Sequence, residues 1–291
     1  MMADAQHIRN PIEWTWDHLS DAAASIGSLG HALLGSAEAR SAPLPTVRRI
    51  SVADLREALI KGIDDFQAYR TDVIFLVLVY PVIGLSLAWL TVGNNALPLL
   101  FPLASGFALI GPVAALGLYE MSRRREKGAT VDWLDAFGVA QSPAFGAAVL
   151  LGIGLLGVFA LWLAAAYGIF HIAFGPEQPA SITAFVRDVF TTSPGWWMIA
   201  AGMGVGLLFA VVVLTISVVS FPFLIDRDVG LYRAVITSVR AVAKNPAVMA
   251  AWGLVVACGL ALGSLPAFIG LIFVLPILGH ATWHLYRKVV A

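Results

Sequence analysis

The stretch LLGIGLLGVFALWLAAAYG, residues 150–168, decides the fold class of this chain. It lies in an uninterrupted apolar run at 144–170, and a helix of about 20 apolar residues is long enough to cross a bilayer. Comparable apolar runs lie near 73–92, 96–119, 196–225, 247–265 and 267–283. The sequence therefore predicts an all-α, polytopic membrane protein with six transmembrane helices.

The composition excludes several other classes. The chain has 291 residues, of which 59% are hydrophobic and 12% are charged, whereas about 25% are charged in a typical soluble domain. The net charge of zero gives no electrostatic reason to expect nucleic acid as a partner. The single cysteine, Cys258, excludes an intrachain disulfide framework and a thiolate metal cage.

The basic residues predict the orientation. Of the 18 Lys and Arg residues, only Arg187 falls in a loop that six spans would place on the outer side. Because Lys and Arg accumulate on the cytoplasmic side of membrane proteins, both termini are predicted to be cytoplasmic. The first 19 residues lack the apolar core of a signal peptide, so the first span is expected to direct insertion into the bacterial inner membrane.

Tryptophan is expected at both membrane surfaces. With this orientation, Trp89, Trp196 and Trp197 are predicted at the outer interface. The residues predicted at the inner interface are Trp133, Trp252 and Trp283.

Two parts of the chain are expected. Residues 1–45 are predicted to form a cytoplasmic amphipathic helix, capped by Asn10, and the beginning of a linker, SAPLPTVRR, which spans residues 41–49. Residues 46–291 are predicted to form the six-helix transmembrane domain with cytoplasmic amphipathic connecting helices.

The first connecting helix is predicted to begin at Ser51, with Asp54 completing a capping box. The apolar face expected for this helix consists of Leu55, Leu59, Ile63 and Phe66.

The spacing of three residue types suggests an internal repeat. A glycine, a proline and an arginine recur at intervals of 6 and 11 residues in the second and sixth spans: Gly106, Pro112 and Arg123 match Gly270, Pro276 and Arg287. The pattern predicts a unit of one amphipathic helix plus a helical hairpin, used three times in parallel, which is a recurring membrane architecture.

Charged residues are absent from all six apolar runs. Ion-coupled transporters and pumps place ionisable groups at membrane depth, so this absence disfavours both. No loop carries a phosphate-binding loop or a nucleophile elbow. The sequence therefore predicts a protein that is not an enzyme and has no cofactor.

The one candidate metal site lies at the predicted cytoplasmic ends of the spans. His280 and His284 are four residues apart and share a helix face, and Glu120 and Asp226 are expected at the same level. Two imidazoles and two carboxylates could hold a divalent metal. In the alternative interpretation, the histidines mark a helix end and their ring nitrogens bond to backbone, water or nearby carboxylates.

Several motifs resemble a known family. They are NPIEW, DDFQAYRTDVIF, FPLASGFALIGPVAALGLYEMSRRREKG, SFPFLIDRDVG, TSVRAVAKNPAVMAAWG and LPILGHATWHLYRKVV. From about Asn10 to the end, the chain is similar to the DUF2189 family of proteobacterial polytopic membrane proteins. The resemblance implies an inner-membrane protein, but no activity, substrate or catalytic residue.

Two functional hypotheses follow. The first is a non-enzymatic accessory, assembly or scaffold protein, whose partners would be membrane lipids and other inner-membrane proteins rather than nucleic acid. The second is a carrier or binding protein for a lipid-like or uncharged small molecule, and a cavity among the spans would favour it. A metal-binding role at the cytoplasmic face is the third alternative.

Overall fold

The computed structural model describes residues 28–77, 89, 97–99, 102–103, 111–113, 115–177, 179–266 and 268–291. Within these ranges the regular structure is helical, and the only strand pairing is an isolated bridge between Val47 and Val290. The predicted all-α class is confirmed. Most of the helix expected after Asn10 lies outside the described residues, but its predicted end falls in residues 28–34, which are helical. Most of the first two predicted spans also lie outside the described residues.

Three described helices are long and apolar enough to cross a membrane: Phe145–Phe174, Ser193–Asp226 and Pro246–Ser264. They coincide with the third, fourth and fifth predicted spans. The sixth predicted span corresponds to α13 (Leu271–Val289), whose second half is polar. Six spans and their orientation therefore stay a prediction.

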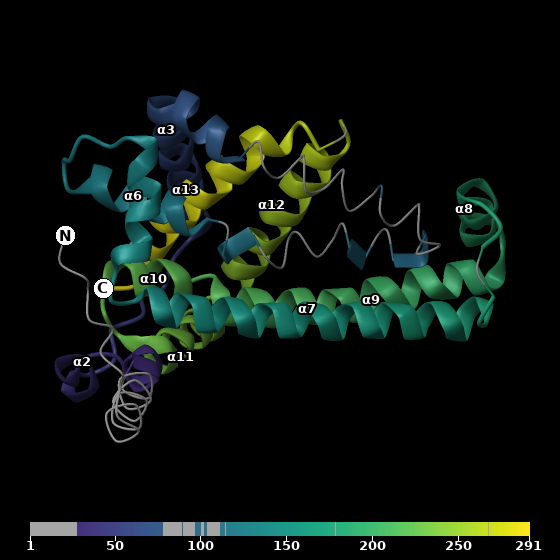
Figure 1. The fold of residues 1–291 in the computed structure, drawn as a ribbon, viewed down its shortest axis with the longest axis horizontal. Helices are drawn as coiled ribbons and strands as arrows, with labels where there is room; N and C mark the ends of the chain where they lie inside the picture. Colours follow the sequence, from purple (N-terminus) through teal and green to yellow (C-terminus); the bar gives the residue numbers. More distant parts are fainter. Residues whose placement is uncertain are drawn as a thin grey trace, which may run out of the picture.

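The longest part of the molecule is a helical hairpin. α7 (Phe145–Phe174) and α9 (Ser193–Ser217) lie side by side along the horizontal axis of Figure 1, and α8 (Ile182–Thr191) lies at their far end. Thr192 caps α9 by accepting a hydrogen bond from the Gly195 amide at 3.2 Å. Pro194 occupies the first turn of α9, where a missing N–H is harmless.

The fourth span is broken near its end. α9 stops at Ser217, and α10 (Ser220–Asp226) begins after two intervening residues. Pro222 cannot donate the helical hydrogen bond to residue 218, which explains a break at this place. The Val219 amide instead bonds to the Ser238 hydroxyl of α11 (Gly230–Lys244) at 3.2 Å.

The opposite end of the molecule from α8 is a compact polar assembly. It consists of α3 (Val52–Val77), α6 (Leu116–Glu126), α10 and the C-terminal half of α13, and the chain ends there (Figure 1). We call this assembly the polar end.

α3 begins as predicted. The Ser51 amide donates to the Asp54 carboxylate at 2.9 Å, and the Asp54 amide donates to the Ser51 hydroxyl at 3.4 Å. The predicted apolar face is wrong at Ile63, which is 38% exposed. Between residues 52 and 68, where the side chains of α3 are described, the buried residues are Leu55, Ala58, Gly62, Asp65 and Phe66.

The segment predicted as a linker lies against the rest of the polar end. The Arg48 amide donates to the Val289 carbonyl at 2.7 Å, and the Ala291 amide donates to the Thr46 carbonyl at 3.0 Å. Asn245 completes the attachment, since its side chain accepts from the Ile50 amide and donates to the Arg48 carbonyl. These bonds tie residues 46–50 to the C-terminus and to the start of α12 (Pro246–Ser264).

The predicted inner aromatic belt is not found at two of its three positions, and the predicted internal repeat is not tested. Trp252 and Trp283 are each 1% exposed, so they pack inside the protein and do not form an inner aromatic belt. The side chain of Trp133, in the 3-10 segment Trp133–Gln141, is not described. The internal repeat stays a prediction, because Gly106 lies outside the described residues.

Candidate functional site

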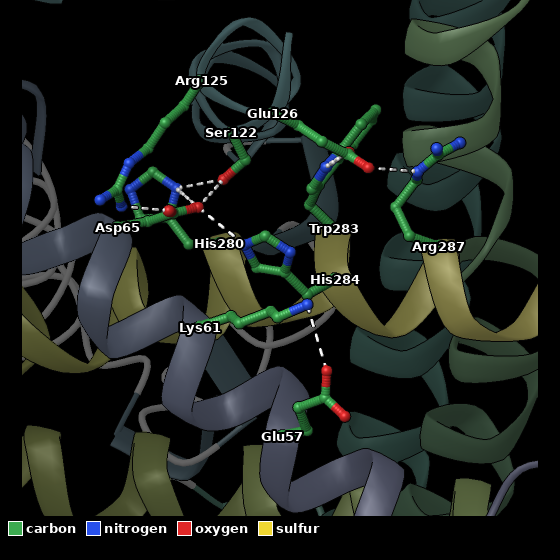
Figure 2. A network of polar contacts seen from close by, with 10 residues as sticks. All are labelled: Glu57, Lys61, Asp65, Ser122, Arg125, Glu126, His280, Trp283, His284 and Arg287. Atoms are coloured by element: carbon green, nitrogen blue, oxygen red, sulfur yellow. Dashed lines mark hydrogen bonds and ion pairs between the residues drawn. The ribbon is translucent and has the colours of Figure 1, made fainter. Parts of the chain in front are cut away.

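A crossing of α3 and α13 builds the polar cluster that contains both candidate histidines. A Cβ on Gly62 would lie 2.7 Å from the Ala281 amide nitrogen and from the Ile277 carbonyl oxygen, so the two backbones touch. One turn further along α3, Asp65 faces α13. Its Oδ2 lies 2.9 Å from His284 Nε2 and 3.9 Å from His280 Nδ1 (Figure 2).

α6 supplies the other two members of the cluster. The Ser122 hydroxyl donates to Asp65 Oδ2 at 2.6 Å and lies 2.7 Å from His280 Nδ1. Arg125 donates to the other carboxylate oxygen, Oδ1. Asp65 therefore joins three helices that are remote in sequence (Figure 2). We call Asp65, Ser122, Arg125, His280 and His284 the Asp65 cluster.

The hydrogen bonds assign the protons within the Asp65 cluster. A serine hydroxyl has one proton, and Ser122 gives it to Asp65. The same oxygen must then accept from His280, which places a proton on Nδ1. The other ring nitrogen, Nε2, is buried with no hydrogen-bond partner among the described residues. The contact with Ser122 thus helps to fix the orientation of the His280 ring.

Asp65 is a stabilised anion although it is only 4% exposed. Burial raises the pKa of a carboxyl group, but the hydrogen bonds from His284 and Ser122 and the charge of the imidazoles outweigh it. The pKa of Asp65 is consequently lower than its ordinary value. The Arg125 guanidinium supplies the balancing positive charge.

The structure separates the four predicted metal-site residues into two pairs. His280 and His284 meet at Asp65, whereas Glu120 accepts hydrogen bonds from Arg123 and Arg124 at 2.7 Å. These bonds hold the pKa of Glu120 below its usual range, against the opposing effect of burial.

Asp226 accepts from the Tyr286 hydroxyl at 2.7 Å, and burial next to this carboxylate raises the pKa of Tyr286. Asp226 and Glu120 line one polar cavity of about 340 Å³, away from the histidines.

The described residues contain no group of three or more His, Cys, Asp or Glu side chains arranged for a metal ion. Metal binding by His280, His284, Glu120 and Asp226 has therefore gained no geometric support and stays a prediction. The histidine nitrogens bond to a nearby carboxylate and a hydroxyl, as the alternative interpretation expects.

The presence of Ser, His and Asp together does not make a catalytic triad. In a triad the aspartate orients the histidine through the ring nitrogen that faces away from the serine. Here Asp65 contacts Ser122 directly, and Ser122 is 1% exposed. The Asp65 cluster has the geometry of a structural junction.

A second feature is an apolar cavity of about 440 Å³ between α9, α12, α13 and the start of α6. α9 contributes Leu207, Ala210, Val211 and Leu214 to one wall, and α12 contributes Leu254, Ala257 and Leu260 to the wall opposite; α13 contributes Leu275, Leu278 and Gly279. We call it the α9–α12 cavity.

Two hydroxyl groups in this wall are satisfied by their own helices. The Ser217 hydroxyl donates to the Val213 carbonyl and the Thr282 hydroxyl donates to the Leu278 carbonyl, each at 2.6 Å. Neither hydroxyl proton is left for an occupant of the cavity. The surface that an occupant would meet is therefore almost wholly hydrocarbon.

The comparison with known protein families gives one match. Residues 100–226 match the family described as predicted integral membrane protein (DUF2189). Over these residues the chain is similar to this family. No curated protein and no solved structure matches the chain. The family predicted from the sequence is confirmed for this segment.

The DUF2189 segment contains only part of each feature. It includes Ser122 and Arg125 but neither Asp65 nor the two histidines. It likewise includes the α9 wall of the cavity, whereas α12 and α13 follow it. Elements outside the matched segment therefore complete both the Asp65 cluster and the α9–α12 cavity.

Asp65 was missed by the sequence analysis, although a signal was present. Leu55, Ala58, Gly62 and Asp65 follow one another at intervals of 3, 4 and 3 residues, which places them on one helix face. An acidic residue on an otherwise small and apolar face predicts a buried partner. Choosing Ile63 instead of Gly62 for that face concealed this pattern.

Proposed function

We propose that this membrane protein binds a lipid-like or uncharged apolar molecule in the α9–α12 cavity, as a carrier or binding protein. The observation that supports the proposal most is a cavity of about 440 Å³ with hydrocarbon walls, set between helices that are themselves apolar enough to span a membrane. Small-molecule sites typically enclose about 300–1,000 Å³.

The wall chemistry selects the class of ligand. A charged group moved into such a cavity would lose its hydration without gaining a partner, which is strongly unfavourable. The Ser217 and Thr282 hydroxyls give their protons to their own helices. An acyl chain or another uncharged hydrocarbon has no hydration to lose and needs no hydrogen-bond partner.

The affinity for a ligand is expected to come from the fit between its shape and that of the cavity. A molecule already dissolved in lipid gains little hydrophobic free energy on entering an apolar cavity, because acyl chains are as apolar as leucine. The gain comes from dispersion contacts with the apolar walls. Discrimination should therefore depend on chain length and branching.

Mild-detergent purification from native membranes, with mass spectrometry of lipids and proteins, tests the proposal. The wild-type protein is expected to retain about one apolar molecule per chain. Ala257→Trp fills the cavity from the α12 wall and should reduce retention by roughly tenfold, a change equal to about 1.4 kcal/mol. Ala261→Trp is the matched control, because Ala261 is also exposed on α12 but does not line the cavity. Equal retention by the two variants would refute the proposal.

An accessory, assembly or scaffold role is the competing proposal. It is supported by α11, which presents Tyr232 and Val239 to its surroundings, 63% and 41% exposed. The same purification distinguishes the two, because a stoichiometric protein partner without retained lipid would favour the accessory role. We propose no enzymatic activity in either case.

We further propose that the protein resides in the bacterial inner membrane with both termini in the cytoplasm. The distribution of Lys and Arg supports this orientation. Reporter fusions after Ala291 and within residues 173–193 would test it. A periplasmic C-terminus would contradict the proposed topology.

A further inference from the structure

α8 carries an apolar arc that is wider than the surface it buries. Successive helical residues are about 100° apart, so the positions of the five large apolar residues of α8 fall within an arc of roughly 140°. These positions are Ile182, Phe185, Val186, Val189 and Phe190. All of them belong to one continuous stripe.

One half of this stripe packs on the α7–α9 hairpin. The Phe185 ring lies edge-on to the rings of Phe170 and Phe174, at centroid distances of 6.0 and 6.2 Å. Val189 is 8% exposed. These contacts fix the rotation of α8 about its own axis.

The other half of the stripe is uncovered. Ile182, Val186 and Phe190 are 43%, 47% and 58% exposed. The Phe190 ring lies 6.4 Å from that of Trp196, which is itself 58% exposed in the first turn of α9. The apolar surface of α8 therefore continues directly onto the surface of a membrane-spanning helix.

The other side of α8 is polar and exposed. Arg187 and Asp188 form an exposed ion pair at 3.1 Å. The Thr191 hydroxyl donates back to the Arg187 carbonyl at 2.7 Å. Such a side is suited to water and lipid headgroups.

We propose that α8 lies in the interface of the lipid leaflet at this end of the molecule, with Ile182, Val186 and Phe190 inserted among the upper parts of the acyl chains. An amphipathic helix with a charged side and an aromatic-aliphatic side adopts this position. The partner is a lipid surface, and this inference is independent of what the α9–α12 cavity binds.

The location of α8 beside the first turn of α9 agrees with a place in the lipid interface. α9 has 25 residues and is about 37 Å long at 1.5 Å per residue, enough to cross a hydrocarbon core of about 30 Å. Trp196 and Trp197 lie in its first turn, exposed, and tryptophan concentrates at the interface. α8 ends two residues before α9 begins, at the same level.

Nitroxide labels on single cysteines test the proposal in liposomes of neutral phospholipid. In a Cys258→Ser background, labels are attached to Val186→Cys and Phe190→Cys, with Arg187→Cys and Thr191→Cys as matched controls on the polar side. Collision rates are measured with oxygen, which concentrates in lipid, and with a water-soluble nickel chelate.

The ratio of oxygen to nickel collisions is expected to be at least fivefold higher at positions 186 and 190 than at 187 and 191. Equal ratios at all four positions would place the stripe in water and overturn the proposal. Dipolar broadening between labels at 186 would show that a second copy covers the stripe, and it would overturn the proposal as well. Because all four side chains are on the surface, labelling should leave the fold intact.

Discussion

The polar end and the α9–α12 cavity solve the problem of buried polar groups in opposite ways. At the polar end, side chains far apart in sequence satisfy one another, such as Asp65 with His284 and Trp283 with Glu126 at 3.0 Å. In the cavity wall, the Ser217 and Thr282 hydroxyls are satisfied within a single helix. The first arrangement joins helices and fixes the fold, whereas the second leaves an apolar surface available for a ligand.

This comparison predicts that the two regions respond differently to substitution. Changes at the polar end should lower stability, and changes in the cavity wall should alter ligand retention with little effect on stability.

The largest effect is expected from Asp65→Ala. It removes the carboxylate that accepts from Ser122, His284 and Arg125. The Ser122 hydroxyl is buried, whereas His284 and Arg125 are partly exposed, so the cost is expected near the lower limit for breaking a buried ion pair, about 3 kcal/mol. The free energy of unfolding in mixed micelles measures it. Asp64→Ala is the control, since Asp64 is exposed and should change stability by less than about 0.5 kcal/mol. Similar losses in both variants would show that the Asp65 cluster does not hold the polar end together.

Gly62→Ala should come next. The added Cβ would lie 2.7 Å from Ala281 backbone and side-chain atoms, and overpacking of this kind costs about 1–3 kcal/mol. Gly154→Ala on α7, where nothing lies within 4 Å, should instead stabilise its helix by roughly 0.5–1 kcal/mol. Opposite signs in unfolding measurements would confirm the tight α3–α13 crossing, and equal signs would disprove it.

Low pH should remove part of the contribution that Asp65 makes to the free energy of unfolding. Its pKa in the folded protein is below the ordinary value of 3.8, so Asp65 stabilises the fold fully above the unfolded pKa. That stabilisation is lost as the pH falls through the lower, folded pKa. Unfolding between about pH 6 and pH 2 should show a smaller loss in Asp65→Asn than in the wild type. A profile unchanged by the substitution would exclude Asp65 as the titrating group.

The smallest effect on stability is expected in the cavity. Ala257→Trp adds an apolar side chain where open space exists, so its free energy of unfolding should stay within about 1 kcal/mol of the wild type. A loss of several kcal/mol would show that the cavity wall is as closely packed as the polar end.

The sequence predicts the apolar helices well because their signal is local. Length and hydropathy alone identify α7, α9 and α12, and the Ser51–Asp54 capping box follows from residues three apart. The similarity to the DUF2189 family could also be recognised from the motifs that fall between residues 100 and 226.

The candidate site could be predicted only in part, because its contacts are long-range. His280 and His284 were identified from their spacing, but Asp65 lies more than 200 residues before them. It reaches them through the close approach of Gly62 and Ala281, and nothing in either helix alone indicates which helix it meets. The burial of Trp252 and Trp283 also results from packing between helices, so a pattern of local hydropathy does not predict it.

The most direct test of ligand binding is an electron cryomicroscopy structure of the protein in nanodiscs that contain phospholipid with brominated acyl chains. The account predicts strong bromine density inside the α9–α12 cavity, between Ala210 and Ala257, and its loss in Ala257→Trp but not in Ala261→Trp. A cavity without density in the wild type, or density unchanged by Ala257→Trp, would contradict it.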